Sequence, residues 1–103
     1  MSHFTELTRN LGDVAENLTI DIYYPLAAGS PAVSRVDVEC SQCMSSYILP
    51  DSVMIRFKTL TIAPQRIKKG FMTENIDRGA TVVFSDGSSE RISFTGDIVR
   101  QSV

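Results

Sequence analysis

Hydrophobic residues near the start of the chain recur at the spacing of an α-helix. Five of them lie three or four residues apart, which places them on one helical stripe: Phe4, Leu7, Leu11, Val14 and Leu18. A helix is therefore predicted over about residues 3–17, with Ser2 as its N-cap. Gly12 lies inside this pattern and indicates a kink or the close approach of another backbone. The stripe is interpreted as a face that packs on a sheet, or alternatively docks on a partner or a second copy.

After this segment the apolar period changes from helical to alternating. Strands are predicted at residues 19–24, 36–40, 47–49 and 53–62, where apolar and polar side chains alternate or a short apolar run ends at a proline. In the last of these the apolar phase slips past Lys58. The slip indicates a one-residue bulge, or a strand that crosses from one sheet layer to another.

The segment from Ala80 to Phe94 predicts a β-hairpin, because Asp-Gly separates two strand-like runs. A two-residue loop would put the apolar side chains of the two strands on opposite faces. A three-residue loop over 85–87, with Gly87 left-handed, pairs Ala80 with Ile92 and puts the apolar side chains on one face. The three-residue loop is therefore favoured, and a second turn is predicted at residues 95–97.

These elements predict an α+β fold, in which the N-terminal amphipathic helix packs on a small antiparallel β-barrel or sandwich of five to six strands. With 103 residues, the chain has the usual size of one domain. We expect a single domain over 1–103, with the helix at about 3–17 and the β-rich body at about 19–103. Residues 64–70 are predicted to form a basic turn or a single helical turn.

The hydropathy of the chain bears on its location. No segment approaches the roughly 18 to 20 apolar residues that span a bilayer. Charged residues in the first fifteen positions interrupt any signal-peptide core. We therefore expect a cytoplasmic protein without membrane association, in which Cys40 and Cys43 are reduced thiols.

Charge is divided unevenly along the chain. Residues 1–51 hold seven acidic and two basic residues, whereas residues 52–103 hold eight basic and five acidic residues. The two halves are thus electrostatically complementary. This division indicates either that the halves pack against each other or that a basic patch binds an acidic partner.

Cys40 and Cys43 are separated by two residues, the spacing of half a tetrahedral zinc site. The other half would need His3, the only histidine, with a carboxylate, or a second copy of the chain. A redox role would need the pair at a helix N-terminus, which the following residues do not predict. The third interpretation is structural, with Cys40 in the core beside Val36 and Val38.

A second candidate site is the basic surface at 56–69, where five basic side chains occur without an acid. It fits an acidic protein surface, a nucleic-acid backbone or a solvated face. Its residues are Arg56, Lys58, Arg66, Lys68 and Lys69.

Catalysis is not expected, because the chain has one histidine and no glycine-rich phosphate loop. The layout of a short N-terminal helix before a β body closed by a hairpin is loosely similar, in size and architecture, to small phage head–tail joining proteins. That likeness implies a structural or accessory role in a phage or mobile element. The sequence therefore predicts a non-catalytic protein-interaction or assembly module that binds a protein or itself. The alternatives are a small metal- or ligand-binding module built on Cys40 and Cys43, and nucleic-acid binding through 56–69.

Overall fold

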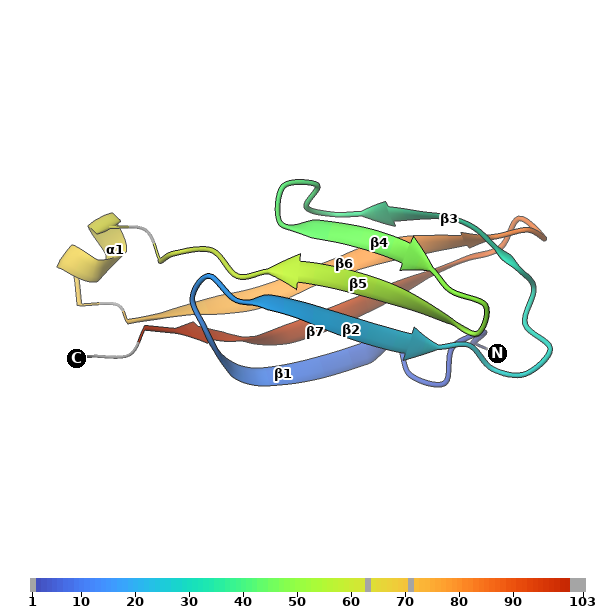
Figure 1. The fold of residues 1–103 in the computed structure, drawn as a ribbon, viewed down its shortest axis with the longest axis horizontal. Helices are drawn as coiled ribbons and strands as arrows, with labels where there is room; N and C mark the ends of the chain where they lie inside the picture. The colour runs from blue at the N-terminus through green and yellow to red at the C-terminus, as the bar shows by residue number, and fades with distance from the viewer. Residues whose placement is uncertain (1, 63, 71, 101–103) are drawn as a thin grey trace.

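The chain folds into β-strands that run along the length of an elongated molecule (Figure 1). The structure is a computed structural model that describes residues 2–62, 64–70 and 72–100. Within these residues the elements are β1 (Thr8–Ala15), β2 (Thr19–Pro25), β3 (Val33–Val38), β4 (Met44–Ile48), β5 (Ser52–Lys58), α1 (Pro64–Lys68), β6 (Thr73–Phe84) and β7 (Ser89–Val99). The predicted α+β class is wrong, because the described fold is nearly all β and the one helix within it, α1, is a single short turn after β5.

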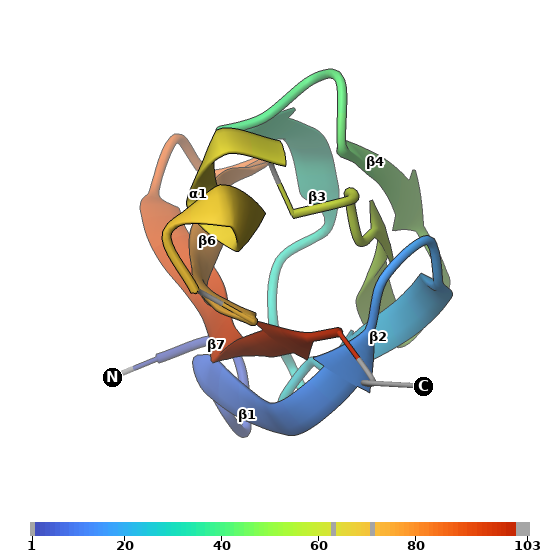
Figure 2. The same cartoon turned by 90° about the vertical axis from the view of Figure 1, so that its left-hand side faces the viewer.

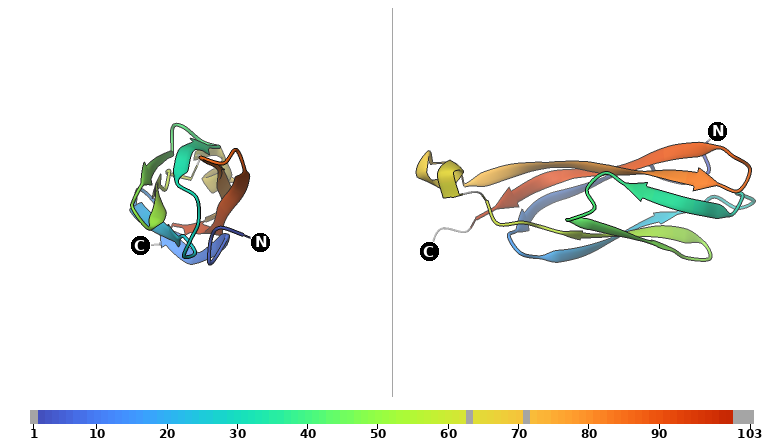
Figure 3. Two further views of the ribbon diagram at one scale, coloured as in Figure 1. Left: turned by 90° about the vertical axis from the view of Figure 1, so that its right-hand side faces the viewer. Right: turned by 90° about the horizontal axis from the view of Figure 1, so that it is seen from above.

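The strands form two open sheets that face each other across the interior (Figure 2). The larger sheet has the order β1-β7-β6-β3 and the smaller sheet the order β2-β5-β4. Neither sheet closes into a barrel, and the described strands number seven rather than the predicted five to six. The molecule measures 50 × 20 × 19 Å, and its long axis follows the strands (Figure 3).

The order of the strands defines the architecture. A β2-β5-β4 sheet facing β3-β6-β7 reproduces the B-E-D and C-F-G strands of an immunoglobulin-type sandwich, with β1 added beside β7. Two marks of antibody domains are missing: the chain has no tryptophan, and its cysteines lie three residues apart instead of in facing strands. The likeness is therefore one of architecture, and architecture alone does not assign a function.

The predicted N-terminal helix is wrong because β1 occupies this part of the chain. β1 pairs with β7 in parallel, and its register shifts between Asn10 and Asp13, where Gly12 has a left-handed backbone (φ 68°). The extra residue of this bulge puts Leu11 and Val14 on the same inward side, so a strand reproduces the three-residue spacing of a helix. A Cβ atom on Gly12 would meet no other atom within 4 Å, so its left-handed backbone in the bulge, and not the predicted close approach of another backbone, accounts for glycine at this position.

The remaining members of the supposed helical stripe have separate environments. Phe4 is buried at the end of the sandwich, where it forms a β-bridge with Leu26 and its ring lies 5.8 Å from that of Phe84. Leu7 and Leu18 are exposed. Ser2 does not cap a helix; its hydroxyl accepts a hydrogen bond from the Phe4 amide.

The closing hairpin has the predicted register. β6 and β7 pair Ala80 with Ile92, the loop spans the three residues after Phe84, and Gly87 has φ 87°. The apolar side chains of both strands consequently face the core together. The second predicted turn, at 95–97, is wrong: β7 continues through Gly96, which allows β1 to come close. A Cβ atom on Gly96 would lie 2.8 Å from the Gly12 carbonyl oxygen.

The phase slip past Lys58 has a simpler cause than a bulge or a crossing strand. β5 ends at Lys58, and Thr59 is completely buried. Its hydroxyl donates to the Ala15 carbonyl at 2.7 Å and accepts from the Leu18 amide at 2.7 Å. A polar residue thus occupies a core position with its hydrogen bonds satisfied. After it, the chain passes from β5 in the smaller sheet to β6 in the larger sheet through irregular residues and α1 (Figure 1).

The core lies between the two sheets, and contacts between residues of opposite sheets stabilise it. The Tyr24 hydroxyl, from β2, donates to the Ser93 carbonyl of β7 at 2.6 Å. The rings of Phe57 and Phe94 lie 4.9 Å apart. Burial raises the pKa of Tyr24 well above its ordinary value, which keeps the phenol in its neutral, donating form.

The uneven distribution of charge reflects packing between the two halves of the chain. Three ion pairs join an acid of the first half to an arginine of the second: Asp21–Arg56, Glu39–Arg91 and Glu16–Arg100. Glu16 also accepts a hydrogen bond from the Ile62 amide at 2.6 Å. It therefore fastens the β1–β2 turn to the segment after β5 and to the end of β7.

We expect Gly96→Ala to destabilise the fold by about 1 to 3 kcal/mol, because the added methyl group overpacks the contact with the Gly12 carbonyl. Urea denaturation followed by circular dichroism measures this loss. Thr95→Ala, one residue earlier on β7, is the control and should change stability by less than about 0.5 kcal/mol. Equal losses in the two variants would contradict the close approach at Gly96.

Glu16 predicts a pH dependence of stability. Its hydrogen bonds, first with Arg100 and then with the Ile62 amide, hold the pKa of Glu16 below its ordinary value. This stabilisation is therefore present above the pKa of the unfolded chain and is lost as the pH falls through the lower folded value. Wild type should melt at a higher temperature than Glu16→Gln at pH 7, and the difference should shrink from about pH 4.5 downwards.

Glu74→Gln is the control for this experiment, because Glu74 makes no ion pair with a residue that the structure describes. A Glu16→Gln difference that stays constant from pH 7 to pH 3 would exclude the proposed role of the carboxylate.

Candidate functional site

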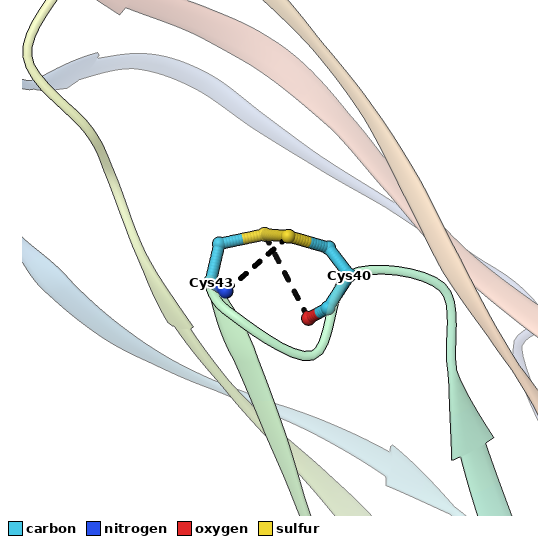
Figure 4. The surroundings of a disulfide bond; sticks show 2 residues. All are labelled: Cys40 and Cys43. Carbon is cyan, nitrogen blue, oxygen red and sulfur yellow. Dashed lines mark hydrogen bonds between the residues drawn. A yellow bond between two sulfur atoms is a disulfide. The ribbon is translucent and has the colours of Figure 1, made fainter.

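Cys40 and Cys43 form a disulfide in the turn between β3 and β4, where the chain passes from the larger to the smaller sheet (Figure 4). The expectation of reduced thiols therefore differs from the structure. Cys43 is buried at 4% exposure, whereas Cys40 packs only partly against the core. The Cys43 amide donates to the Cys40 sulfur at 3.2 Å, and the Met44 amide donates to the Cys40 carbonyl at 3.0 Å.

The disulfide gives this pair a structural role in the turn. While the two sulfurs are bonded to each other, neither is available as the thiolate that zinc requires. The described residues also contain no cluster of three histidine, cysteine or acidic side chains with the spacing of a metal site. The core-packing interpretation is the one that the geometry favours, although Cys43, not Cys40, is the more deeply buried residue.

The five predicted basic residues fall into two groups. Arg56 and Lys58 project from β5 on the outer face of the smaller sheet. Arg66 and Lys68 belong to α1, and Lys69 follows directly. The irregular residues 59–62 separate the groups, and α1 lies at one end of the long axis (Figure 1). The basic stretch is continuous in sequence but is divided between a sheet face and the end of the molecule.

Arg56 is held in place by two neighbours on the sheet. Its guanidinium donates to both carboxylate oxygens of Asp21, at 2.8 and 3.3 Å, and lies 5.2 Å from the centre of the Tyr47 ring. The hydrogen bond with Arg56 holds the pKa of Asp21 below its ordinary value. The same bond raises the pKa of Arg56. The pair therefore stays ionised, and the planar guanidinium is fixed against the aromatic ring.

A row of large side chains lies beside this pair. Met54 is the cross-strand partner of Tyr23 on one side and of Tyr47 on the other. Met54 points outward, yet only 7% of it is exposed, which its two flanking tyrosines explain. The tyrosines themselves remain 50% and 41% exposed. The smaller sheet thus presents a Tyr-Met-Tyr row to solvent, next to the fixed arginine.

Beyond Arg56, in the second row after the tyrosines, Lys58 pairs with Thr19 across the sheet. Lys58 makes no ion pair with any described residue. We call the whole surface the aromatic–cationic face; it comprises Thr19, Asp21, Tyr23, Ser45, Tyr47, Met54, Arg56 and Lys58.

An open groove of about 310 Å³ borders the aromatic–cationic face at the disulfide turn. It brings together three residues that the sequence had singled out separately: Cys43, Arg56 and Lys58. Hydroxyl and amide side chains supply most of its other polar groups, from Thr19, Ser41, Gln42 and Ser45. The groove can accept hydrogen bonds and negative charge, but it holds no general base or nucleophile in an activating arrangement.

A larger hollow of about 510 Å³ lies between the loops that follow β2 and β4. Its walls are residues 26–33 and 48–51, and Asp51 is their only ionisable side chain. This hollow offers an apolar surface but little that would orient a ligand. The aromatic–cationic face is therefore the better candidate site.

Sequence reasoning missed the Tyr-Met-Tyr row. The alternation in β2 does place Tyr23 on the solvent side, which is an unusual position for a tyrosine and was the available signal. The row itself depends on the register of three strands. The pairings of Tyr23 and Tyr47 with Met54 link residues 31 and seven positions apart in the chain, and no local pattern encodes the first of them.

No described helix is long and apolar enough to cross a membrane. The comparisons with protein families and with curated proteins found no match to this chain.

We predict that opening the Cys40–Cys43 bond costs about 2 kcal/mol of folding free energy, because the bond closes a loop of only four residues. Urea titrations of wild type with and without dithiothreitol measure this loss. A Cys40→Ser/Cys43→Ala variant should match reduced wild type and should not respond to the reductant. A variant as stable as the oxidised protein would show that the bond contributes nothing to stability.

Proposed function

We propose that this protein is a non-catalytic interaction or assembly module that binds a protein partner through the aromatic–cationic face. The observation that carries the proposal is the Tyr23–Met54–Tyr47 row, which the sheet holds on its solvent side beside Arg56. Tyrosine, methionine and arginine are enriched at the centres of protein interfaces, where a few such side chains supply most of the binding free energy.

The arrangement of the face supports a protein as the ligand. The two tyrosines lie on β2 and β4, the strands on either side of β5. The Arg56 guanidinium is already fixed on the Tyr47 ring, so little side-chain freedom is lost when a partner binds. Lys58 adds a charge beyond Arg56, at one end of the face, which suits an acidic rim on the partner. A nucleic-acid surface is less well supported, because Arg56 is neutralised by Asp21, and Arg66, Lys68 and Lys69 lie at α1, away from the sheet.

The remaining expectations follow from this proposal. No residue is assigned a catalytic role, and no cofactor is required. The cytoplasmic location stays part of the proposal; in that compartment the Cys40–Cys43 bond would be opened by cellular reductants, and the face uses neither sulfur. The likeness to phage head–tail joining proteins no longer contributes, because it depended on an N-terminal helix that the structure replaces with β1.

Photo-crosslinking tests the face directly. The photoreactive residue benzoylphenylalanine, placed at position 47 in the cell that carries the gene, should form a covalent adduct with a protein partner. The same residue at Leu18, an exposed apolar position in the β1–β2 turn, is the matched control and should form no such adduct. Adducts are measured by electrophoresis and mass spectrometry.

Competition then tests which side chains matter. Unlabelled wild type should suppress the adduct. The Tyr23→Ser/Tyr47→Ser variant should suppress it equally only at a roughly 30-fold higher concentration, as expected for the loss of an interface hot spot. Both tyrosines are exposed, so the variant should keep its fold, which a thermal melt checks. Equal competition by the variant, or equal adducts from position 18, would contradict the proposal.

A further inference from the structure

The sheet on the opposite side of the molecule presents a surface of different chemistry. Around β7, the outward side chains of three neighbouring strands are short carboxylates, amides and a hydroxyl, while Ile76, Phe94 and Ile98 point inward to the core. We call this surface the carboxylate face; it comprises Asn10, Asp13, Asn75, Asp77, Thr95 and Asp97.

The carboxylate face gathers three aspartates on neighbouring strands. Asp13 and Asp97 are direct cross-strand partners, an arrangement in which like charges destabilise a sheet. Neither residue, nor Asp77, forms an ion pair with a described residue. Further along the same sheet the acids are paired, for instance Glu39 with Arg91. The unpaired negative charge is therefore confined to one part of the sheet.

The aromatic–cationic face has the complementary charge at the same level of the long axis. Phe57 lies between Arg56 and Lys58 in β5, and its ring contacts that of Phe94 across the core. Phe94 immediately precedes Thr95, the central residue of one row of the carboxylate face. Lys58 on one face and the carboxylates of the other thus lie on opposite sides of a sandwich about 20 Å across.

We infer that the partner of the aromatic–cationic face is a second copy of this chain, bound through its carboxylate face. A copy shifted perpendicular to the sheets, without rotation, brings Lys58 of one molecule to the carboxylate face of the next. The inference rests on the proposed function and specifies its partner. It also brings an unpaired cation, Lys58, to aspartates that form no ion pair with a described residue.

The alternative symmetric pairing is disfavoured by charge. Two aromatic–cationic faces packed on each other would bring Lys58 of both copies into one interface, and two carboxylate faces would gather six aspartates. Contact between unlike faces avoids both. Such a contact does not close on itself after two copies, so it stacks molecules into an open row.

Two face variants test this arrangement. Tyr47→Ser/Lys58→Ser disables the aromatic–cationic face, and Asp77→Lys/Asp97→Lys disables the carboxylate face. In sedimentation velocity, wild type should form a ladder of oligomers that grows with protein concentration and shrinks with added salt. Each variant alone should associate roughly 30-fold more weakly or worse, because it leaves charges of the other face unpaired.

The equimolar mixture of the two variants is the decisive sample. Each variant keeps one intact face, so the mixture should form a 1:1 dimer and nothing larger. Asp51→Lys, a charge change in the β4–β5 turn outside both faces, is the control and should behave as wild type. Thermal melts establish that every variant is folded before it is compared.

Specific results would overturn the inference. If the Asp77→Lys/Asp97→Lys variant associates as well as wild type, or the mixture stays monomeric while wild type forms oligomers, the faces do not pair. If wild type is monomeric at millimolar concentration but crosslinking through position 47 still captures a different protein, the self-partner is wrong and the proposed function stands. If substitutions at Tyr23, Tyr47 and Lys58 change neither the self-association of the protein nor its crosslinking to a partner, both proposals fail.

Discussion

Strict alternation along β5 controls both the interior and the exterior of the smaller sheet. Val53, Ile55 and Phe57 must face the core, and this requirement forces the intervening residues outward. Because β5 is the central strand, its pairings with β2 and β4 also determine which residues stand beside them. A slip of one residue in either pairing would move the neighbouring strand's tyrosine away from Met54 and turn it toward the core. The hydrophobic interior thereby sets the composition of the face to which we assign binding.

Local patterns predicted the elements that local physics determines. The hairpin register followed from the need to keep the apolar side chains of β6 and β7 on one face, and the structure has the same pairing of Ala80 with Ile92. The inward side of β2 was equally readable, because Ile22 and Tyr24 alternate with polar neighbours. In both segments the two-residue period of a strand was sufficient to predict which side chains face the core.

The errors arose where a second effect imitated a familiar pattern. A bulge at Gly12 converted the period of a strand into the three-residue spacing of a helix, so the N-terminal segment was misassigned. A buried threonine that satisfies its hydrogen bonds at position 59 looked like a change of strand phase. The candidate site was only partly foreseen: Arg56 and Lys58 were named, but the tyrosines beside them depend on pairings between distant strands, which no local pattern contains.

The parallel pairing of β1 with β7 has a consequence for how the chain acquires its structure. Thr8 and Ser93 are neighbours in the sheet but 85 residues apart in sequence. β1 therefore leaves the ribosome well before β7 and cannot pair with it until β7 has been made. Such distant contacts slow folding, and until they form the new chain exposes unpaired strand edges to aggregation. Folding during synthesis should therefore be sensitive to chaperones and to truncations that remove β7.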